Sequence, residues 1–358
     1  MGDIDKKTLY ENLARHLHQG VIGAPLSPSL LKILEIMFTE EEAEVALRLP
    51  FENKTLGEIE RLIPDKAPRL ENILSAMAKN GTVFTLQKPG KKRVYRLLPT
   101  VVGFAEAPFW PGVPSEKARK LAPLWIQYRN EGFGEELSRN IPAVRVIPID
   151  RSLRNSSEIL PFDRIREKMK TVKYFAVSKC PCRQMMAYEG KGCSHSLENC
   201  LHFNDMGRYV VEQGMGREIS MEEAVRILEE ADGEGLVHTV ENLDGFMSMI
   251  CNCCGCCCVF LQTQKKMNLR MISSSNYVSK VDSESCAGCG TCCRRCPMDA
   301  VAVDDSGTAK VDAERCIGCG VCAPTCPTGA IALVLRQDVS APPDVGEFLA
   351  KRYLAPAG

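Results

Sequence analysis

Apolar residues recur at helical spacing along the first hundred residues. Leucines four positions apart predict a helix over residues 6–18. Two further helical patterns are separated by a turn, and alternating apolar residues then predict a hairpin around Pro89-Gly90. The additional elements expected here are helices at about 27–38, 55–62 and 68–79 and strands at 83–86 and 93–97.

Beyond residue 105, helical and strand patterns alternate, which is typical of an α/β domain. Ser220 and Glu223 form a capping box at the start of one of these helices. The helices are expected at about 116–130, 162–169 and 220–231, and the strands at 144–149, 172–177, 236–240, 300–303 and 330–333. We therefore predict a multidomain α+β fold with a helical domain at 1–105, a cysteine-rich α/β domain at 106–270, and a C-terminal domain and tail at 271–358.

The order helix, turn, helix, hairpin over about residues 40–100 resembles the winged-helix fold, many members of which bind DNA. Between residues 54 and 97 there are ten basic and four acidic residues. The basic residues at the hairpin tip are suited to phosphate contacts: Lys88, Lys91, Lys92 and Arg93. The second helix offers few side chains suited to reading base edges, so a scaffold or docking role is the favoured interpretation.

Composition limits the classes of partner and the cellular compartment that we expect for the protein. Its 358 residues contain 45 lysines and arginines and 45 aspartates and glutamates, so the net charge favours neither nucleic acid nor membrane. Nineteen cysteines, many closely spaced, do not resemble a disulfide framework, and residues 1–7 lack the apolar core of a secretory signal. We therefore expect a reducing compartment, the cytoplasm. The most apolar stretch, 246–261, contains six cysteines and is short for a bilayer crossing.

Eight cysteines form the same pattern twice, thirty residues apart. In each run the cysteines are separated by two, two and three residues, and a proline follows the last one. Four thiolates at this spacing hold a [4Fe–4S] cluster, whereas a zinc site would need only one such run. The first run is Cys286, Cys289, Cys292 and Cys296, and the second is Cys316, Cys319, Cys322 and Cys326.

The stretch from about residue 276 to 335 resembles the bacterial ferredoxins with two [4Fe–4S] clusters. In that arrangement the fourth cysteine of each run binds the other cluster. The resemblance implies one cluster on Cys286, Cys289, Cys292 and Cys326 and another on Cys316, Cys319, Cys322 and Cys296. Cys293 would be a spare thiol, and Arg294 and Arg295 would either dock an acidic patch on a partner or form a solvated surface.

Ten further cysteines mark the middle of the chain: Cys180, Cys182, Cys193, Cys200, Cys251, Cys253, Cys254, Cys256, Cys257 and Cys258. We expect the first four to converge on part of the 251–258 segment as an additional iron–sulfur site. In an extended chain, alternate cysteines of that segment would share a face: Cys254, Cys256 and Cys258 on one side and Cys251, Cys253 and Cys257 on the other. The alternatives are a structural zinc, with His195 as a further candidate ligand, and buried thiols that only fill space.

Most of residues 100–335 resembles uncharacterised two-cluster ferredoxin-domain proteins of anaerobic bacteria and archaea, which implies electron transfer. The favoured hypothesis is an electron carrier, or an electron-transfer subunit of an oxidoreductase, that relays low-potential electrons between a donor protein and a redox enzyme. One alternative is a redox-sensing winged-helix regulator that binds DNA. The other is a reductase with an open-site cluster, because Cys253-Cys254-Gly255 resembles the Cys-Cys-Gly elements of heterodisulfide reductases. The chain contains no Walker loop and no dinucleotide fingerprint.

Overall fold

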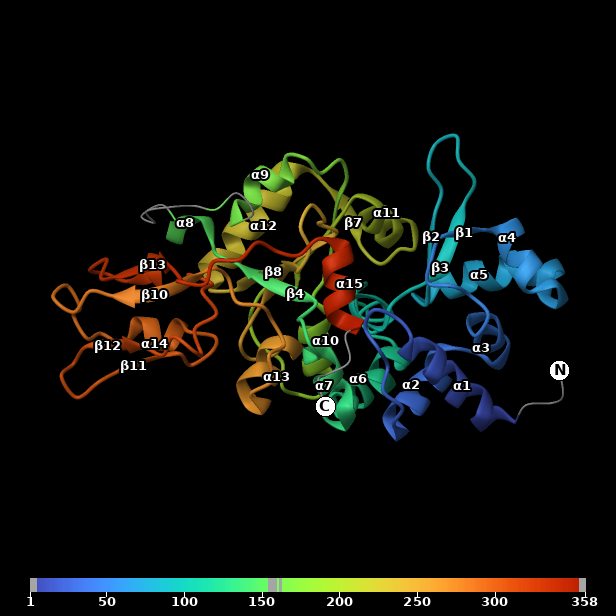
Figure 1. Cartoon of the computed structure of the whole chain (residues 1–358), viewed down its shortest axis with the longest axis horizontal. Coiled ribbons are helices and arrows are strands. Elements are labelled where there is room, and N and C mark those ends of the chain that lie inside the picture. The colour runs from blue at the N-terminus through green and yellow to red at the C-terminus, as the bar shows by residue number, and fades with distance from the viewer. Residues whose placement is uncertain (1–4, 154–159, 161–162, 354–358) are drawn as a thin grey trace. The chain divides into compact units, whose positions relative to one another are not determined.

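The computed structural model describes residues 5–153, 160 and 163–353 (Figure 1). The chain divides into two compact units, and each unit is built from several segments. Unit 1 consists of Met1–Leu137, Ser178–Gly192 and Asp205–Glu218, and unit 2 consists of Ser138–Val177, Cys193–Asn204 and Ile219–Gly358. The predicted α+β class is confirmed, whereas the division at residues 105 and 270 stays a prediction.

Unit 1 begins with the two helices predicted at 6–18 and about 27–38, which are α1 (Lys6–His18) and α2 (Pro28–Met37). The side chain of Ser27 caps α2 by accepting a hydrogen bond from the backbone N–H of Leu30. Next come α3 and β1, which the sequence pattern did not predict, and then the expected pair of helices. These elements are α3 (Glu40–Ala46), β1 (Lys54–Thr55), α4 (Leu56–Leu62), a 3₁₀ turn (Pro64–Arg69) and α5 (Leu70–Lys79).

The predicted hairpin is confirmed as β2 (Val83–Leu86) and β3 (Val94–Leu97), which join β1 in the order β1-β3-β2. Two of its basic side chains pair with carboxylates of α11 (Asn204–Glu212). Lys88 Nζ lies 2.7 Å from an Asp205 oxygen, and Arg93 Nη1 lies 3.7 Å from a Glu212 oxygen. Lys91 and Lys92 are exposed. Half of the cationic tip is therefore neutralised within the unit, which weakens the argument for phosphate binding.

The rest of unit 1 is built around aromatic side chains. The ring of Trp125 on α6 (Glu116–Tyr128) lies 5.7 Å from Phe104 and 5.8 Å from Tyr128, measured between ring centroids. Such tilted ring pairs contribute beyond the area that they bury. The remaining elements are two irregular helical turns (Thr100–Phe104 and Arg129–Phe133), α7 (Gly134–Ser138) and α10 (Pro181–Tyr188).

Unit 2 contains a six-stranded sheet in the order β4-β8-β9-β6-β5-β7, in which β4-β8, β8-β9 and β9-β6 pair antiparallel. Its buried core combines side chains from these strands with those of two helices, including Ile250, Leu201, Met169 and Leu228. The elements are β4 (Val144–Ile147), α8 (Asp150–Leu153), α9 (Ile165–Met169), β5 (Phe175–Lys179), β6 (Glu198–Phe203), β7 (Arg217–Ile219), α12 (Met221–Glu234), β8 (Val237–Glu241), β9 (Met249–Cys253) and α13 (Val259–Met267). Residue 162, where a helix was expected to begin, lies outside the described residues.

The C-terminal part of unit 2 contains two small sheets, β10 (Tyr277–Val281) with β13 (Ile331–Leu335), and β11 (Val301–Val303) with β12 (Ala309–Val311). The predicted strands after both proline turns are thus confirmed (Figure 1, orange and red). Two short helical turns lie between the strands: α14 (Thr291–Arg295), which contains Cys292 and Cys293, and a 3₁₀ turn at Ala323–Thr325, which is flanked by Cys322 and Cys326.

The C-terminal tail ends in a helix, α15 (Val345–Tyr353), which the sequence pattern did not predict. Arg352 is 2% exposed and donates hydrogen bonds from Nη1 to the carbonyls of Arg139 and Ile141. The tail is therefore packed against unit 2 rather than extended as a free arm. In the part of the chain that the structure describes, no helix has the length and apolar character needed to span a membrane.

A buried polar network joins α12 to the sheet of unit 2. His238 on β8 lies 2.7 Å from Asp232 on α12 through Nε2 and 2.6 Å from Asn252 on β9 through Nδ1. Asn252 in turn donates to the carbonyl of Asn199 at 2.7 Å. All of these side chains are buried, so removing one member leaves the others without a solvated alternative.

We predict that His238→Leu lowers the free energy of unfolding by about 2–3 kcal/mol, because the Asp232 carboxylate and the Asn252 side-chain oxygen lose the buried hydrogen bonds that they make with His238. Urea unfolding followed by circular dichroism measures this change. The matched substitution His18→Leu, at an exposed histidine of α1, is expected to stay within about 0.5 kcal/mol of the original protein. Equal destabilisation by both substitutions would contradict the assignment.

Candidate metal centres

The first three cysteines of the first run and the last cysteine of the second run line one small cavity. Its walls include the four cysteines that the crossed arrangement assigns to one cluster: Cys286, Cys289, Cys292 and Cys326. Gly288 has a φ of +63°, and a β-carbon at that position would collide with the carbonyl oxygen of Gly307. Glycine is therefore required where the cysteine loop turns beside the neighbouring hairpin.

The other three cysteines of the second run gather around Cys296 from the first run. Burial raises the pKa of the Cys319 thiol, and the nearby Cys322, Cys296 and Cys316 raise it further. Burial likewise raises the pKa of Cys322 to about 11, with Cys316 and Cys296 adding to the effect. A thiolate raises the pKa of another thiol only at short range, because the two negative charges repel, so these cysteines are close to one another. The structure thus brings together the second crossed set as well as the first.

Several donors point at the sulfur atoms of both sets. The backbone N–H of Ala300 donates to Cys296 Sγ at 3.2 Å, and that of Ala309 donates to Cys286 Sγ at 3.4 Å. The hydroxyl of Ser279 lies 3.2 Å from Cys322 Sγ. Hydrogen bonds to cluster sulfurs are one of the means by which a protein sets a reduction potential.

The two sets differ in exposure. Cys289, in the first run, is exposed, whereas Cys316, Cys319 and Cys322 of the second run are each 8% exposed or less. The second loop is attached to the rest of unit 2 by backbone hydrogen bonds: Ile149 N–H donates to the carbonyl of Cys319 at 3.1 Å, and Ser275 N–H donates to that of Ile317 at 3.0 Å. The first set therefore has an edge at the surface, whereas three of the four thiols of the second set are buried and the fourth, Cys296, is half-buried.

Arg295 is half-buried and hydrogen-bonded within unit 2, and a role for Arg294 and Arg295 in docking an acidic patch on a partner stays a prediction. Arg295 Nη2 donates to the backbone carbonyls of Asp232 and Gly233, both at 2.7 Å, at the C-terminal end of α12. A cation at this end of a helix is favourable because the last carbonyls carry partial negative charge. Arg294 is exposed, and its guanidinium lies 3.4 Å from the carbonyl oxygen of Cys289.

Among the middle cysteines, four gather at one point. The sulfur atoms of Cys193, Cys254, Cys256 and Cys257 all lie within 4.8 Å of one another. Cys193 Sγ is 4.0 Å from Cys254 Sγ, and Cys256 Sγ is 3.9 Å from Cys257 Sγ. Burial and the neighbouring thiols of Cys254 and Cys193 raise the pKa of Cys256 to about 12. Part of the expected convergence is therefore present, and it involves one distant cysteine and three from the dense segment.

The expected alternation of faces along residues 251–258 is not found. The extended strand β9 ends at Cys253, a turn follows at 255–257, and Cys258 caps the start of α13. The turn places Cys256 and Cys257 on the same side as Cys254, which an extended chain cannot do. Local turn geometry thus overrides the period of two on which the expectation was based.

The other middle cysteines have different surroundings. Cys200 is buried on β6, Cys251 Sγ lies 3.7 Å from the sulfur of Met249, and Cys253 Sγ lies 3.6 Å from the Thr239 hydroxyl. Cys180 and Cys182 belong to unit 1, where a hydrogen bond between them, together with burial, raises the pKa of the Cys180 thiol. Metal binding by these cysteines stays a prediction.

His195, a candidate zinc ligand from the sequence, lies outside the four-cysteine group. Its Nδ1 is 3.2 Å from a carboxylate oxygen of Glu234, which also accepts a hydrogen bond from the backbone N–H of Ser196 at 2.9 Å. Glu234 therefore holds the loop that begins at Cys193. This contact could not be recognised from the sequence, because the two residues are 39 positions apart.

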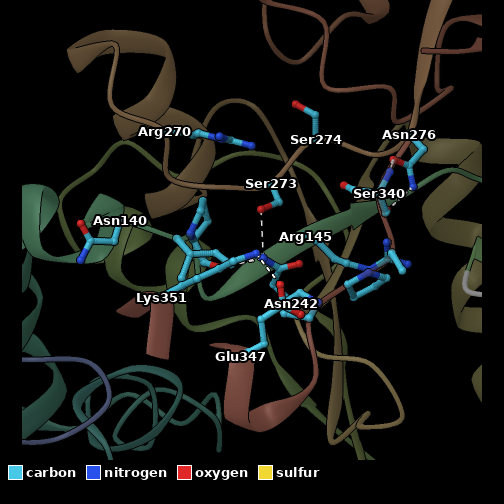
Figure 2. Close-up of a pocket in the computed structure, with 15 residues that line it drawn as sticks. Asn140, Arg145, Asn242, Arg270, Ser273, Ser274, Asn276, Ser340, Glu347 and Lys351 are labelled. Atoms are coloured by element: carbon cyan, nitrogen blue, oxygen red, sulfur yellow. Dashed lines mark hydrogen bonds and ion pairs between the residues drawn. The ribbon is translucent and has the colours of Figure 1, made fainter. Parts of the chain in front are cut away.

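A second hollow in unit 2 is polar and contains no cysteine (Figure 2). Its lining residues come from the segment 140–145, from Asn242, from the segment 270–276 and from the C-terminal tail. Two of its three cations are paired with carboxylates: Arg145 lies 3.1 Å from Asp163, and Lys351 lies 2.6 Å from Glu347. The pocket therefore adds little net charge, and the cysteine groups carry the candidate chemistry.

Comparison with known families agrees with the first two centres. Residues 279–333 match the model of the family described as 4Fe-4S dicluster domain. The searches of curated proteins and of solved structures each returned no match. The matched segment contains both cysteine runs, so the C-terminal part of unit 2 is a two-cluster iron–sulfur domain.

Proposed function

We propose that this protein relays low-potential electrons between a donor protein and a redox enzyme through two [4Fe–4S] clusters, as a carrier or as a subunit of an oxidoreductase. The observation that carries the proposal is the grouping of the two crossed sets of cysteines, one of them at the surface and the other enclosed. A protein that relays electrons needs one cluster near the surface, where a partner can exchange electrons with it, and a second cluster that the protein shields from solvent.

The proposed ligands are Cys286, Cys289, Cys292 and Cys326 for the first cluster and Cys316, Cys319, Cys322 and Cys296 for the second. The residues present fit such groups. The first set lines a cavity. Among the described residues, neither set has all four sulfur atoms within 4.8 Å of one another, and the wider spacing suits a cluster better than a single ion. In the described part of the chain, the group whose sulfurs lie within 4.8 Å of one another is the separate group in the middle segment.

When bound, clusters of this type supply one-electron exchange at low potential. The chain contributes three things: four thiolates per cluster, which leave no position for a substrate; donors to the sulfurs, such as Ala300 N–H and Ala309 N–H; and an apolar enclosure that limits water around Cys319 and Cys322. These features favour electron transfer over substrate conversion at the dicluster domain.

The exposed edge at Cys289 is the proposed surface for exchange with a partner. Ala287 and Thr291 flank it, and Ala287 is exposed. The winged-helix alternative has less support, because two of its four hairpin-tip cations already pair with carboxylates.

We predict that Cys286→Ala removes one cluster and leaves the other, so that iron and acid-labile sulfide fall from about eight to about four per chain. Both are measured on protein purified without oxygen. The neighbouring thiol Cys293 provides the matched control, since Cys293→Ala is expected to retain the full content. Loss of a cluster in the Cys293 variant, with none lost in the Cys286 variant, would show that the ligands are assigned wrongly.

We predict that Ala287→Trp slows reduction by a protein donor at least several-fold and leaves reduction by dithionite unchanged, because the indole holds a large partner away from the cluster edge. Stopped-flow bleaching of the cluster absorbance, with a reduced two-[4Fe–4S] ferredoxin as the donor, measures both rates. Ala76→Trp, at an exposed alanine on α5, is the control and should leave both rates unchanged. Equal rates with the protein donor in all three proteins would place the exchange surface elsewhere.

A further inference from the structure

We infer that Cys193, Cys254, Cys256 and Cys257 bind a single tetrahedral metal ion, with zinc as the best fit, and that this ion holds the segment that carries Cys296 in place. The first half of this inference is independent of the proposed electron relay. The second half rests on it, since it concerns a proposed cluster ligand.

The spacing of the sulfur atoms favours one ion over a cluster. Tetrahedral zinc with Zn–S bonds of about 2.3 Å places its sulfurs about 3.8 Å apart. Two of the sulfur pairs here are 4.0 and 3.9 Å apart, and all four atoms lie within 4.8 Å. In a cubane each thiolate binds a different iron at a separate corner, so the thiolates stand farther apart. The dense cysteine segment therefore does not fit the further iron–sulfur cluster that the sequence led us to expect.

The ligand chemistry is also that of a structural site. All four ligands are thiolates, a set that selects zinc or iron. Cys254 and Cys257 are 3% and 2% exposed, Cys193 is half-buried, and Cys256 is exposed. With four protein ligands the ion has no open position, so the site is suited to holding chain segments together rather than to activating a substrate.

The turn that carries three of the cysteines packs directly against the dicluster domain. A β-carbon on Gly255 would lie 2.5 Å from the carbonyl oxygen of Pro297, so glycine is required there. Pro297 immediately follows Cys296. The side chain of Gln262 donates to the carbonyl of Gly255 at 2.6 Å and fixes the other side of the turn. An ion bound by this turn would therefore hold in place the surface on which the Cys296 segment rests.

The fourth cysteine is positioned from the same region. Glu234 at the end of α12 holds the loop that follows Cys193, and Arg295 binds the carbonyls of Asp232 and Gly233 at that same helix end. Lys265 on α13 forms an ion pair with Asp299, which is three residues after Cys296, and 2.6 Å separates the charged atoms. The proposed ion would thus fix one side of an interface that hydrogen bonds and charge already define.

The experiment measures zinc, iron and acid-labile sulfide on the full chain purified without oxygen. The variant is Cys256→Ser, because Cys256 is the exposed member of the group and its replacement disturbs packing least. The matched control is Cys251→Ser, five residues earlier on β9 and outside the group. Cobalt replacement of the metal gives a second readout, since tetrahedral Co²⁺ bound to thiolates has intense visible absorption.

We expect about one zinc, or one iron without matching sulfide, in addition to the dicluster irons. This ion should be lost in Cys256→Ser and kept in Cys251→Ser, and only the first variant should lose iron faster on incubation with a chelator. Four additional irons with four sulfides would overturn the single-ion inference, as would an absence of metal beyond the dicluster irons. One zinc without eight irons would instead contradict the proposed relay and leave the ion site standing.

Discussion

The arrangement of the centres depends on a few backbone hydrogen bonds that attach the second cysteine loop to the rest of unit 2. Ile149 N–H and Ser275 N–H donate to carbonyls within residues 317–319, and the Ser275 hydroxyl donates to Gly318 at 2.7 Å. The two cysteine runs have the same spacing, so spacing alone would make their centres equivalent. Attachment on one side makes them different, because it encloses the second set and leaves Cys289 at the surface.

A second set of contacts joins the dicluster domain to the middle segment within unit 2. Arg295 caps the end of α12, the Pro297 backbone packs on Gly255, and Asp299 pairs with Lys265. Arg295, Pro297 and Asp299 lie within three residues of Cys296. The segment that would supply a ligand to the enclosed cluster is therefore also the segment held by the middle of the chain. A metal ion in the four-cysteine group would connect cluster binding to the packing of unit 2.

Periodic and repeated patterns were sufficient to predict much of this structure. The leucine spacing predicted α1, the alternating runs predicted β2 and β3, and the repeated cysteines predicted the dicluster domain. Short elements without a periodic face, such as α3, β1 and α10, were missed because they contain too few turns or residues to show a period.

The four-cysteine group could be predicted only in part. Cys193 and Cys254 are 61 residues apart, so no spacing rule connects them. Which of the dense cysteines meet Cys193 depends on where β9 ends and on the turn at Gly255, against which the Pro297 backbone packs. The sequence contains the thiols, but tertiary packing selects among them.

The most direct test of the central claim is a potentiometric titration of the full chain, followed by low-temperature electron paramagnetic resonance. The account predicts two one-electron reductions in the negative part of the range of about −700 to +450 mV that iron–sulfur clusters cover, with spectra broadened by the interaction of two neighbouring clusters. A single reducible cluster, or no reduction in this range, would contradict the relay.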